Sequence, residues 1–206
     1  GNWLINKRDT DAHEWQLQIY DGNFIITLFD SSFTTNNYIS EQISNPLTLN
    51  EWNHIIATYD GSESASGLKL YLDGELLSTT ESTAGTYNGM GNGVAPVQIG
   101  KPGWEVTSDR MFHGLMDEVA IYNKELTEDE VNYLYESKKA QFIEFKEGYE
   151  GKGTGINFDG VDDYVEVNNF PNLNTDFTIS AWINTNDNEK PGRIFADDES
   201  NSGGYA

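Results

Sequence analysis

The sequence predicts an all-β fold, an antiparallel β-sandwich with one short helix. Short runs in which polar and apolar residues alternate recur along the 206 residues, and Gly, Asn, Ser and Asp separate them. Only one stretch has the periodicity of a helix. Short strands at regular spacing with turn residues between them are typical of sandwiches of antiparallel sheets.

The clearest strands come in hairpins. Residues 14–20 and 24–29 flank Asp21 and Gly22, a pair that accepts the positive φ angles of a type I′ turn. The same device recurs where Asp73 and Gly74 stand between two apolar runs. Including that second hairpin, strands are further predicted at residues 52–59, 68–72, 75–77, 97–100, 112–122, 156–158, 164–167 and 177–184.

The one predicted helix begins after Leu126. Thr127 is a suitable N-cap, and Glu130 stands three residues later, which together make a capping box. Leu126 can pack against Val131 across the cap. A single short helix in an all-β chain is expected to close one end of the sandwich.

The charge balance argues against nucleic acid as a partner. The chain has 12 Lys and Arg against 34 Asp and Glu, a formal net charge of −22. Such a surface repels phosphate backbones. Two interpretations of the acidic residues stay open: they keep the protein soluble, or some of them cluster to bind divalent cations.

Other classes are excluded by what the sequence lacks. Cysteine is absent, so disulfides, thiolate zinc sites and cysteine nucleophiles are excluded. No run approaches the ~18 apolar residues of a membrane helix, so no membrane span is expected. A large core can stabilise an extracellular domain without disulfides, so the missing cysteine does not indicate the cytoplasm.

Several segments resemble concanavalin A-like, laminin-G-like domains. Residues 155–167, with the motif Phe-Asp-Gly-Val-Asp-Asp-Tyr-Val, and residues 177–183 resemble the opening of such a domain. Residues 51–61 and 70–74 resemble its central strand and next hairpin, and residues 98–127 resemble its closing segment. The resemblance implies a jelly-roll sandwich, an extracellular or cell-surface location, and a glycan or cell-surface ligand.

The order of these motifs departs from the family. The closing motifs come first and the opening motifs last, as in a circular permutation or in a chain that straddles two tandem domains. Residues 1–11 also align with residues 192–200. We therefore predict two parts, 1–141 and 154–206, joined by a linker at 142–153. Since half a sandwich would expose bare strand edges, the two parts should complete one sandwich, within the chain, by swapping in a homodimer, or with tandem neighbours.

Acidic residues cluster in the opening motif. Asp159, Asp162 and Asp163 lie within five positions, beside Gly160. Calcium takes six to eight oxygen ligands, and a glycine turn lets carbonyl groups approach. The resemblance implies a calcium ion at this turn and a further acidic ligand from the closing segment. Ca²⁺ is thus the expected cofactor, with Asp159, Asp162 and Asp117 as ligands; the alternative is a solvated acidic turn.

Sugar recognition needs aromatic faces beside polar groups, and loops on a rigid sandwich are where such residues gather. Trp104 is the best candidate platform, unless it packs under its own loop. Tyr87, Asn88 and Asn92 lie in a second, Gly-rich loop.

These observations favour a binding module over an enzyme. A glycosidase needs two carboxylates across a cleft, and no predicted strand carries the paired pattern. The sequence therefore predicts a calcium-dependent, lectin-like carbohydrate-binding module of a larger extracellular or cell-surface protein. The alternative is a structural or protein-binding repeat of a surface adhesin, without sugar binding.

Overall fold

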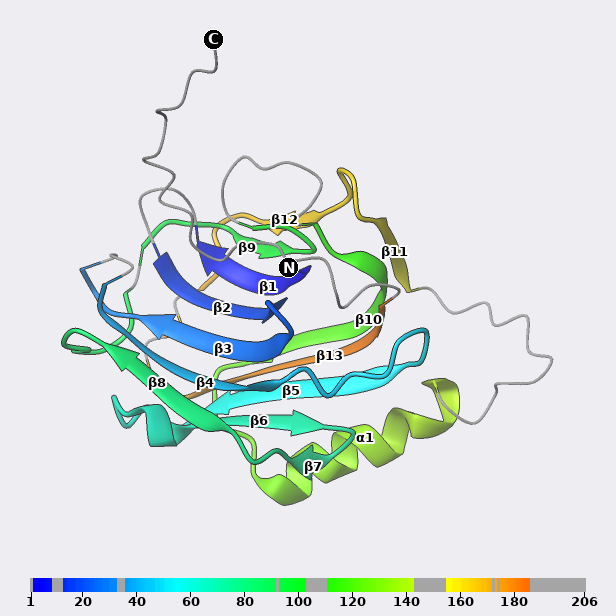
Figure 1. Cartoon of the computed structure of the whole chain (residues 1–206), viewed down its shortest axis with the longest axis horizontal. Coiled ribbons are helices and arrows are strands. Elements are labelled where there is room, and N and C mark those ends of the chain that lie inside the picture. Colours follow the sequence, from blue (N-terminus) through cyan, green and yellow to red (C-terminus); the bar gives the residue numbers. More distant parts are fainter. Residues whose placement is uncertain are drawn as a thin grey trace, which may run out of the picture.

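Two antiparallel sheets face each other in a computed structural model of the chain (Figure 1). The structure describes residues 2–8, 13–32, 36–91, 93–102, 111–142, 155–171, 173 and 175–185. In this part of the chain, one α-helix, α1 (Glu128–Phe142), and a short 3-10 helix, η1 (Ala65–Gly67), accompany the strands. The fold is the predicted antiparallel jelly-roll sandwich with one short α-helix.

The sheet nearer the viewer in Figure 1 has seven strands in the order β12-β9-β1-β2-β3-β4-β8. The strands are β1 (Asn2–Arg8), β2 (His13–Tyr20), β3 (Asn23–Phe29), β4 (Tyr38–Ser44), β8 (Thr80–Ala84), β9 (Val97–Ile99) and β12 (Val165–Val167). The β2–β3 hairpin turns at Asp21 and Gly22, whose φ angles are 47° and 70°. These positive values confirm the predicted turn.

The second sheet has six strands in the order β11-β10-β13-β5-β6-β7. The strands are β5 (Asn53–Tyr59), β6 (Leu68–Leu72), β7 (Glu75–Leu76), β10 (His113–Tyr122), β11 (Ile156–Asp159) and β13 (Phe177–Thr185). Every predicted strand is present to within one residue at each end. β1, β4 and β8 were not predicted as strands; β4 and β8 carry many polar side chains, so their alternation is weak.

The core lies between the inner faces of the two sheets. It joins apolar side chains of β1–β3 to those of β5, β10 and β13. Trp15 is fully buried there, and Trp3 is also buried. The core also takes Phe158 of β11, so residues late in the chain pack with residues near its start.

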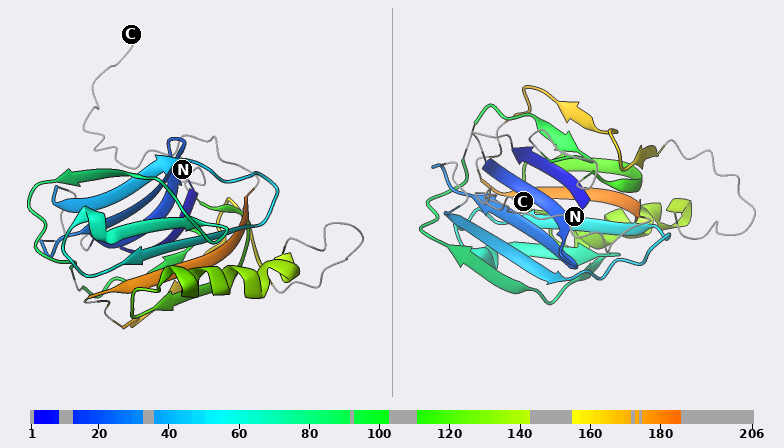
Figure 2. Two further views of the ribbon diagram at one scale, coloured as in Figure 1. Left: turned by 90° about the horizontal axis from the view of Figure 1, so that it is seen from below. Right: turned by 45° about the horizontal axis from the view of Figure 1, so that its top comes forward.

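Helix α1 packs on the outer face of the six-stranded sheet and does not close an end of the sandwich, as the sequence suggested (Figure 2, left). Leu126 and Val131 form a second apolar cluster with Ile56 of β5 and Tyr71 of β6. The capping box is confirmed: the Thr127 amide donates to Glu130 Oε2 at 3.0 Å, and the Glu130 amide donates to Thr127 Oγ1 at 3.3 Å. The helix lies where the outer face offers apolar side chains.

The segment 155–185 contributes strands to both sheets. β12 lies at the edge of the seven-stranded sheet and β11 at the edge of the six-stranded sheet, whereas β13 lies between β10 and β5. Residues from both sides of the predicted linker therefore share the same sheets.

Candidate functional site

One row of cross-strand neighbours on the outer face of the seven-stranded sheet is polar on every strand. Gln16 illustrates the pattern, because its neighbours Trp15 and Leu17 point into the core and Gln16 points away from it. In sheet order the row, which we call the polar row, consists of Glu166, Gln98, Asn6, Gln16, Thr27, Ser40 and Ser82.

The middle of the polar row is held in place by hydrogen bonds. The Ser40 hydroxyl donates to the Ile26 carbonyl at 2.8 Å and lies 3.3 Å from Thr27 Oγ1. Arg8 Nη1 donates to Gln16 Oε1 at 2.7 Å. Such contacts fix the orientation of side chains that face outward.

Arg8 borders this region as a buried cation. Its guanidinium lies 5.6 Å from the ring centre of Trp3 and 5.4 Å from that of Phe29, distances typical of cation–π contacts. Burial lowers the pKa of Arg8 to about 9. The guanidinium remains charged at neutral pH and is shielded by aromatic rings.

A groove with a volume of about 340 Å³ crosses strands β2, β3, β4 and β8, and the residues of the polar row on these four strands are part of its lining. Its lining consists mainly of amides, hydroxyls and aromatic rings: Gln16, Gln18, Tyr20, Asp21, Asn23, Ile25, Thr27, Phe29, Tyr38, Ser40, Gln42 and Ser82. The rings of Tyr20 and Tyr38 are half-buried, so both present a partly open face. Among the described residues of this lining, Asp21 is the only acidic one, and none is Lys or Arg.

Gln18 is the least satisfied side chain of the groove. It is only 1% exposed, and neither its Nε2 nor its Oε1 has a hydrogen-bond partner. A buried polar group without a partner costs about 1–3 kcal/mol, so native proteins rarely leave one unmatched. Asn6 Oδ1 and Gln98 Oε1 in the polar row are also buried without partners, but these two residues do not line the groove. The amide of Gln18, which does, can both donate and accept hydrogen bonds.

The acidic turn between β11 and β12 brings together part of the predicted metal site. Carboxylate oxygens of Asp159, Asp162 and Asp163 lie within 4.8 Å of one another. Asp159 Oδ1 accepts the Val161 amide at 2.8 Å, and Asp163 Oδ2 accepts the Asp159 amide at 3.0 Å. Three carboxylates fit part of the oxygen shell that calcium requires.

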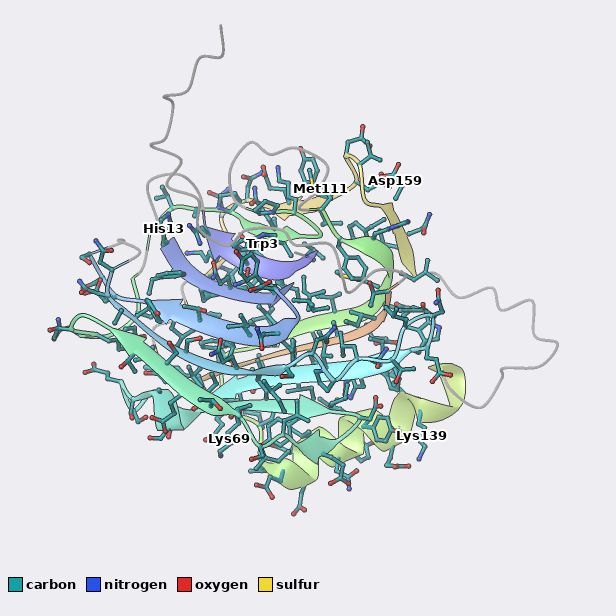
Figure 3. All side chains as sticks on the ribbon, viewed as in Figure 1. Trp3, His13, Lys69, Met111, Lys139 and Asp159 are labelled. Carbon is teal, nitrogen blue, oxygen red and sulfur yellow. The ribbon has the colours of Figure 1, made fainter. Side chains whose placement is uncertain are left out.

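Asp117, the third predicted ligand, is not in this group. Asp159 pairs with His113 at one end of the β10–β11 ladder, whereas Asp117 lies four residues farther along β10. Its Oδ1 accepts the neighbouring Glu118 amide at 2.7 Å. The third carboxylate of the group is that of Asp163, and Figure 3 shows Asp159 at the upper right of the molecule.

The predicted sugar-binding loops are only partly described. Tyr87 is half-buried and packs against the core, where burial raises the pKa of its hydroxyl. It also lines a second cavity of about 340 Å³, together with Glu63 and Glu81. Asn88 is exposed, and Trp104 and Asn92 lie outside the described residues. The groove on the sheet was missed; its sequence signal is the alternation of Gln16 and Gln18 with apolar residues.

Comparison with known proteins identifies the family. A family model described as the concanavalin A-like lectin/glucanases superfamily matches residues 2–132, and the chain belongs to this superfamily. Neither a curated protein nor a solved structure gives a match. In the described part of the chain, no helix has both the length and the apolar character needed to cross a membrane.

Proposed function

We propose that this member of the concanavalin A-like superfamily is a lectin-like module that holds a neutral glycan in the groove on the outer face of its seven-stranded sheet. The observation that carries the proposal is a nearly uncharged groove in a chain with a net charge of −22. The unpartnered amide of Gln18 in that groove points to a ligand of matching chemistry.

The lining chemistry supports a sugar better than an ion. A cation would be drawn to carboxylates, and an anion would need Arg or Lys, yet the part of the lining that the structure describes has one Asp and no basic residue. Sugar hydroxyls donate and accept hydrogen bonds, as the amides of Gln16, Gln18 and Gln42 do. The rings of Tyr20 and Tyr38 offer apolar faces for sugar C–H groups.

The same lining supports binding over hydrolysis. Glycosidases generally use two carboxyl groups about 5–10 Å apart, one on each side of the scissile bond. Of the described residues that line the groove, Asp21 is the only carboxylate. A glycan held there would meet groups that bind it, and these described residues do not supply the second acid that cleavage requires.

We further propose that Asp159, Asp162 and Asp163 hold a calcium ion at the β11–β12 turn. Calcium would neutralise three clustered carboxylates. Since the groove lies over β2–β4 and β8, the ion would support the fold and would not bridge protein to sugar. Extracellular modules bind calcium at about 10⁻⁴–10⁻³ M, which suits the proposed extracellular or cell-surface location.

The second candidate is a structural or protein-binding repeat of a surface adhesin. The order of the family motifs favours it, because a chain that straddles tandem domains belongs to an array. In that case the polar row would contact a neighbouring protein surface or only water.

The test is a glycan array probed with the wild-type chain and with Gln18→Leu, which keeps the side-chain volume and removes the amide. We expect binding to neutral oligosaccharides, reduced at least tenfold in Gln18→Leu and unchanged in the control Asn157→Ala on exposed β11. Binding should persist after chelation while thermal stability falls. A folded chain that binds no glycan would favour the adhesin repeat, and equal binding by Gln18→Leu would exclude this groove.

A further inference from the structure

Strand β13 fills a slot in the middle of the six-stranded sheet. Seven of its residues pair with β5 and seven pair with β10, and all but Asn184 are buried. Without β13, both β5 and β10 would present an unpaired row of backbone amides and carbonyls to each other across the gap. Unpaired buried backbone groups are costly, so residues 2–142 need a strand in this position.

Both faces of β13 make contacts that β13 of a second copy of this chain would also make in the slot between β5 and β10. On the inner face, Phe177 and Ile179 enter the core. On the outer face, Thr178 Oγ1 accepts the Leu126 amide at 2.9 Å and donates to the Lys124 carbonyl at 2.9 Å. Trp182 stacks on His54, with ring centres 4.8 Å apart.

All these contacts join residues far apart in the chain. Even the closest backbone pair in sequence, Tyr122 with Thr178, is separated by α1, β11 and β12. None of the contacts depends on a short connection between the partners. The same segment from a second copy would make them equally well.

One further observation marks 155–185 as a separate unit. The family model matches residues 2–132 and ends before this segment, although the segment fills the centre of a sheet.

We propose that the slot between β5 and β10 accepts the segment 155–185 of a second copy of this chain, and that two chains exchange these segments to form a closed dimer. The exchanged dimer uses the same contacts as the monomer, so the equilibrium between monomer and dimer depends on chain concentration. Residues 143–154 tether the segment, and a short tether gives an effective concentration of about 1 mM. Exchange therefore competes when chains refold together near that concentration.

Paired cysteines test this proposal, because the chain has no cysteine of its own. Leu115 of β10 and Asn184 of β13 are cross-strand neighbours and half-buried. Paired residues of antiparallel strands have Cα atoms about 4.5–5.5 Å apart, within the range of a disulfide. Chains carrying Leu115→Cys and chains carrying Asn184→Cys are refolded together at about 1 mM and oxidised.

We expect a disulfide-linked heterodimer that disappears when the two chains refold separately or at a hundredfold dilution. The double variant Leu115→Cys/Asn184→Cys, refolded dilute, should form the bond within one chain. Leu115→Cys mixed with Ser137→Cys, on the exposed face of α1, measures random cross-linking. No heterodimer above this background, or only monomer by light scattering of concentrated refolded wild type, would overturn the exchange. Neither result bears on glycan binding.

Discussion

The two outer faces of the sandwich differ in what covers them. The six-stranded sheet is covered by α1, and beneath the helix His54 Nε2 and Ser180 Oγ lie 3.0 Å apart, while Thr178 bridges to the chain before the helix. Buried atoms without a hydrogen-bond partner occur on this face too, at His54 Nδ1, Thr58 Oγ1 and Tyr71 OH. The seven-stranded sheet carries the groove, which is lined by Gln18 with both of its polar atoms unpartnered.

This contrast shows that strand alternation alone does not distinguish a structural face from a binding face. Both sheets direct one set of side chains into a shared core and the other set outward. What differs is the surface that the outward set meets. It is the helix on one face, and a ligand on the other in our proposal. The following predictions test each half of the comparison.

The largest effect is expected beneath the helix. Trp182 is 1% exposed and packs against both His54 and Tyr135, with ring centres 4.8 Å and 5.7 Å away. Trp182→Ala should lower the free energy of unfolding by about 3–5 kcal/mol, measured by denaturant titration. Tyr133→Ala, exposed on the same helix, should change it by less than about 0.5 kcal/mol. Similar values for both variants would mean that the helix does not cover this face in solution.

The second effect depends on pH. Burial lowers the pKa of His54 to about 4, below its ordinary value of about 6.5. The unfolded state therefore binds the proton first, and stability falls as pH drops from 6.5 towards 4, by about 3 kcal/mol. Above pH 6.5 this contribution is constant.

Unfolding curves of wild type and His54→Gln between pH 7 and 4 measure this loss. Asp73 accepts the His54 amide at 2.8 Å, and burial raises its pKa. Asp73 therefore favours folding at low pH and loses that contribution as pH rises, the opposite sign. The difference between the two chains gives the contribution of His54 alone, and parallel curves would show that folding does not lower the pKa of His54.

A smaller effect is expected at the start of the helix. Thr127→Ala removes the side chain that accepts the Glu130 amide at 3.3 Å. Loss of an N-cap costs about 1 kcal/mol, so the thermal midpoint should fall by a few degrees. Ser137→Ala, near the other end of α1, serves as control. An equal midpoint for Thr127→Ala and wild type would contradict the capping box.

The smallest change in stability is expected for Gln18 in the groove. Gln18→Leu removes an amide without partners, so stability should stay within about 0.5 kcal/mol or rise. Gln16→Leu should cost more, about 1 kcal/mol, because the hydrogen bond from Arg8 Nη1 to Gln16 Oε1 would be lost. Chemical denaturation of both variants makes the comparison. A large loss in Gln18→Leu would show that its amide has a structural partner in solution.

Local signals sufficed for much of the fold. The positive φ of Asp21 and Gly22, the cap at Thr127 and most strands depend on residues close together in sequence, and the structure agrees with them. The strands β4 and β8 escaped prediction because they gain their stability from neighbours across the sheet, and polar side chains hide the alternation.

The candidate site followed from the sequence only in part. The turn between β11 and β12 brings together Asp159, Asp162 and Asp163, which lie within five positions in the sequence. Asp117 was assigned from the family pattern, and it lies farther along β10. The groove needs the register of four strands, which sets Gln16 beside Thr27 and Ser40. No short stretch of sequence contains that information.

The sequence by itself determined the β-sandwich, its hairpins, the capped helix and the acidic turn, because each arises from propensities and spacings within a few residues. Only the tertiary structure decided that α1 covers one sheet and leaves a polar row on the other, and that β13 completes a sheet built by residues far before it. Strand register and burial are properties of the packed sheets, so the outward glutamines form a groove with other polar residues only when the strands lie side by side.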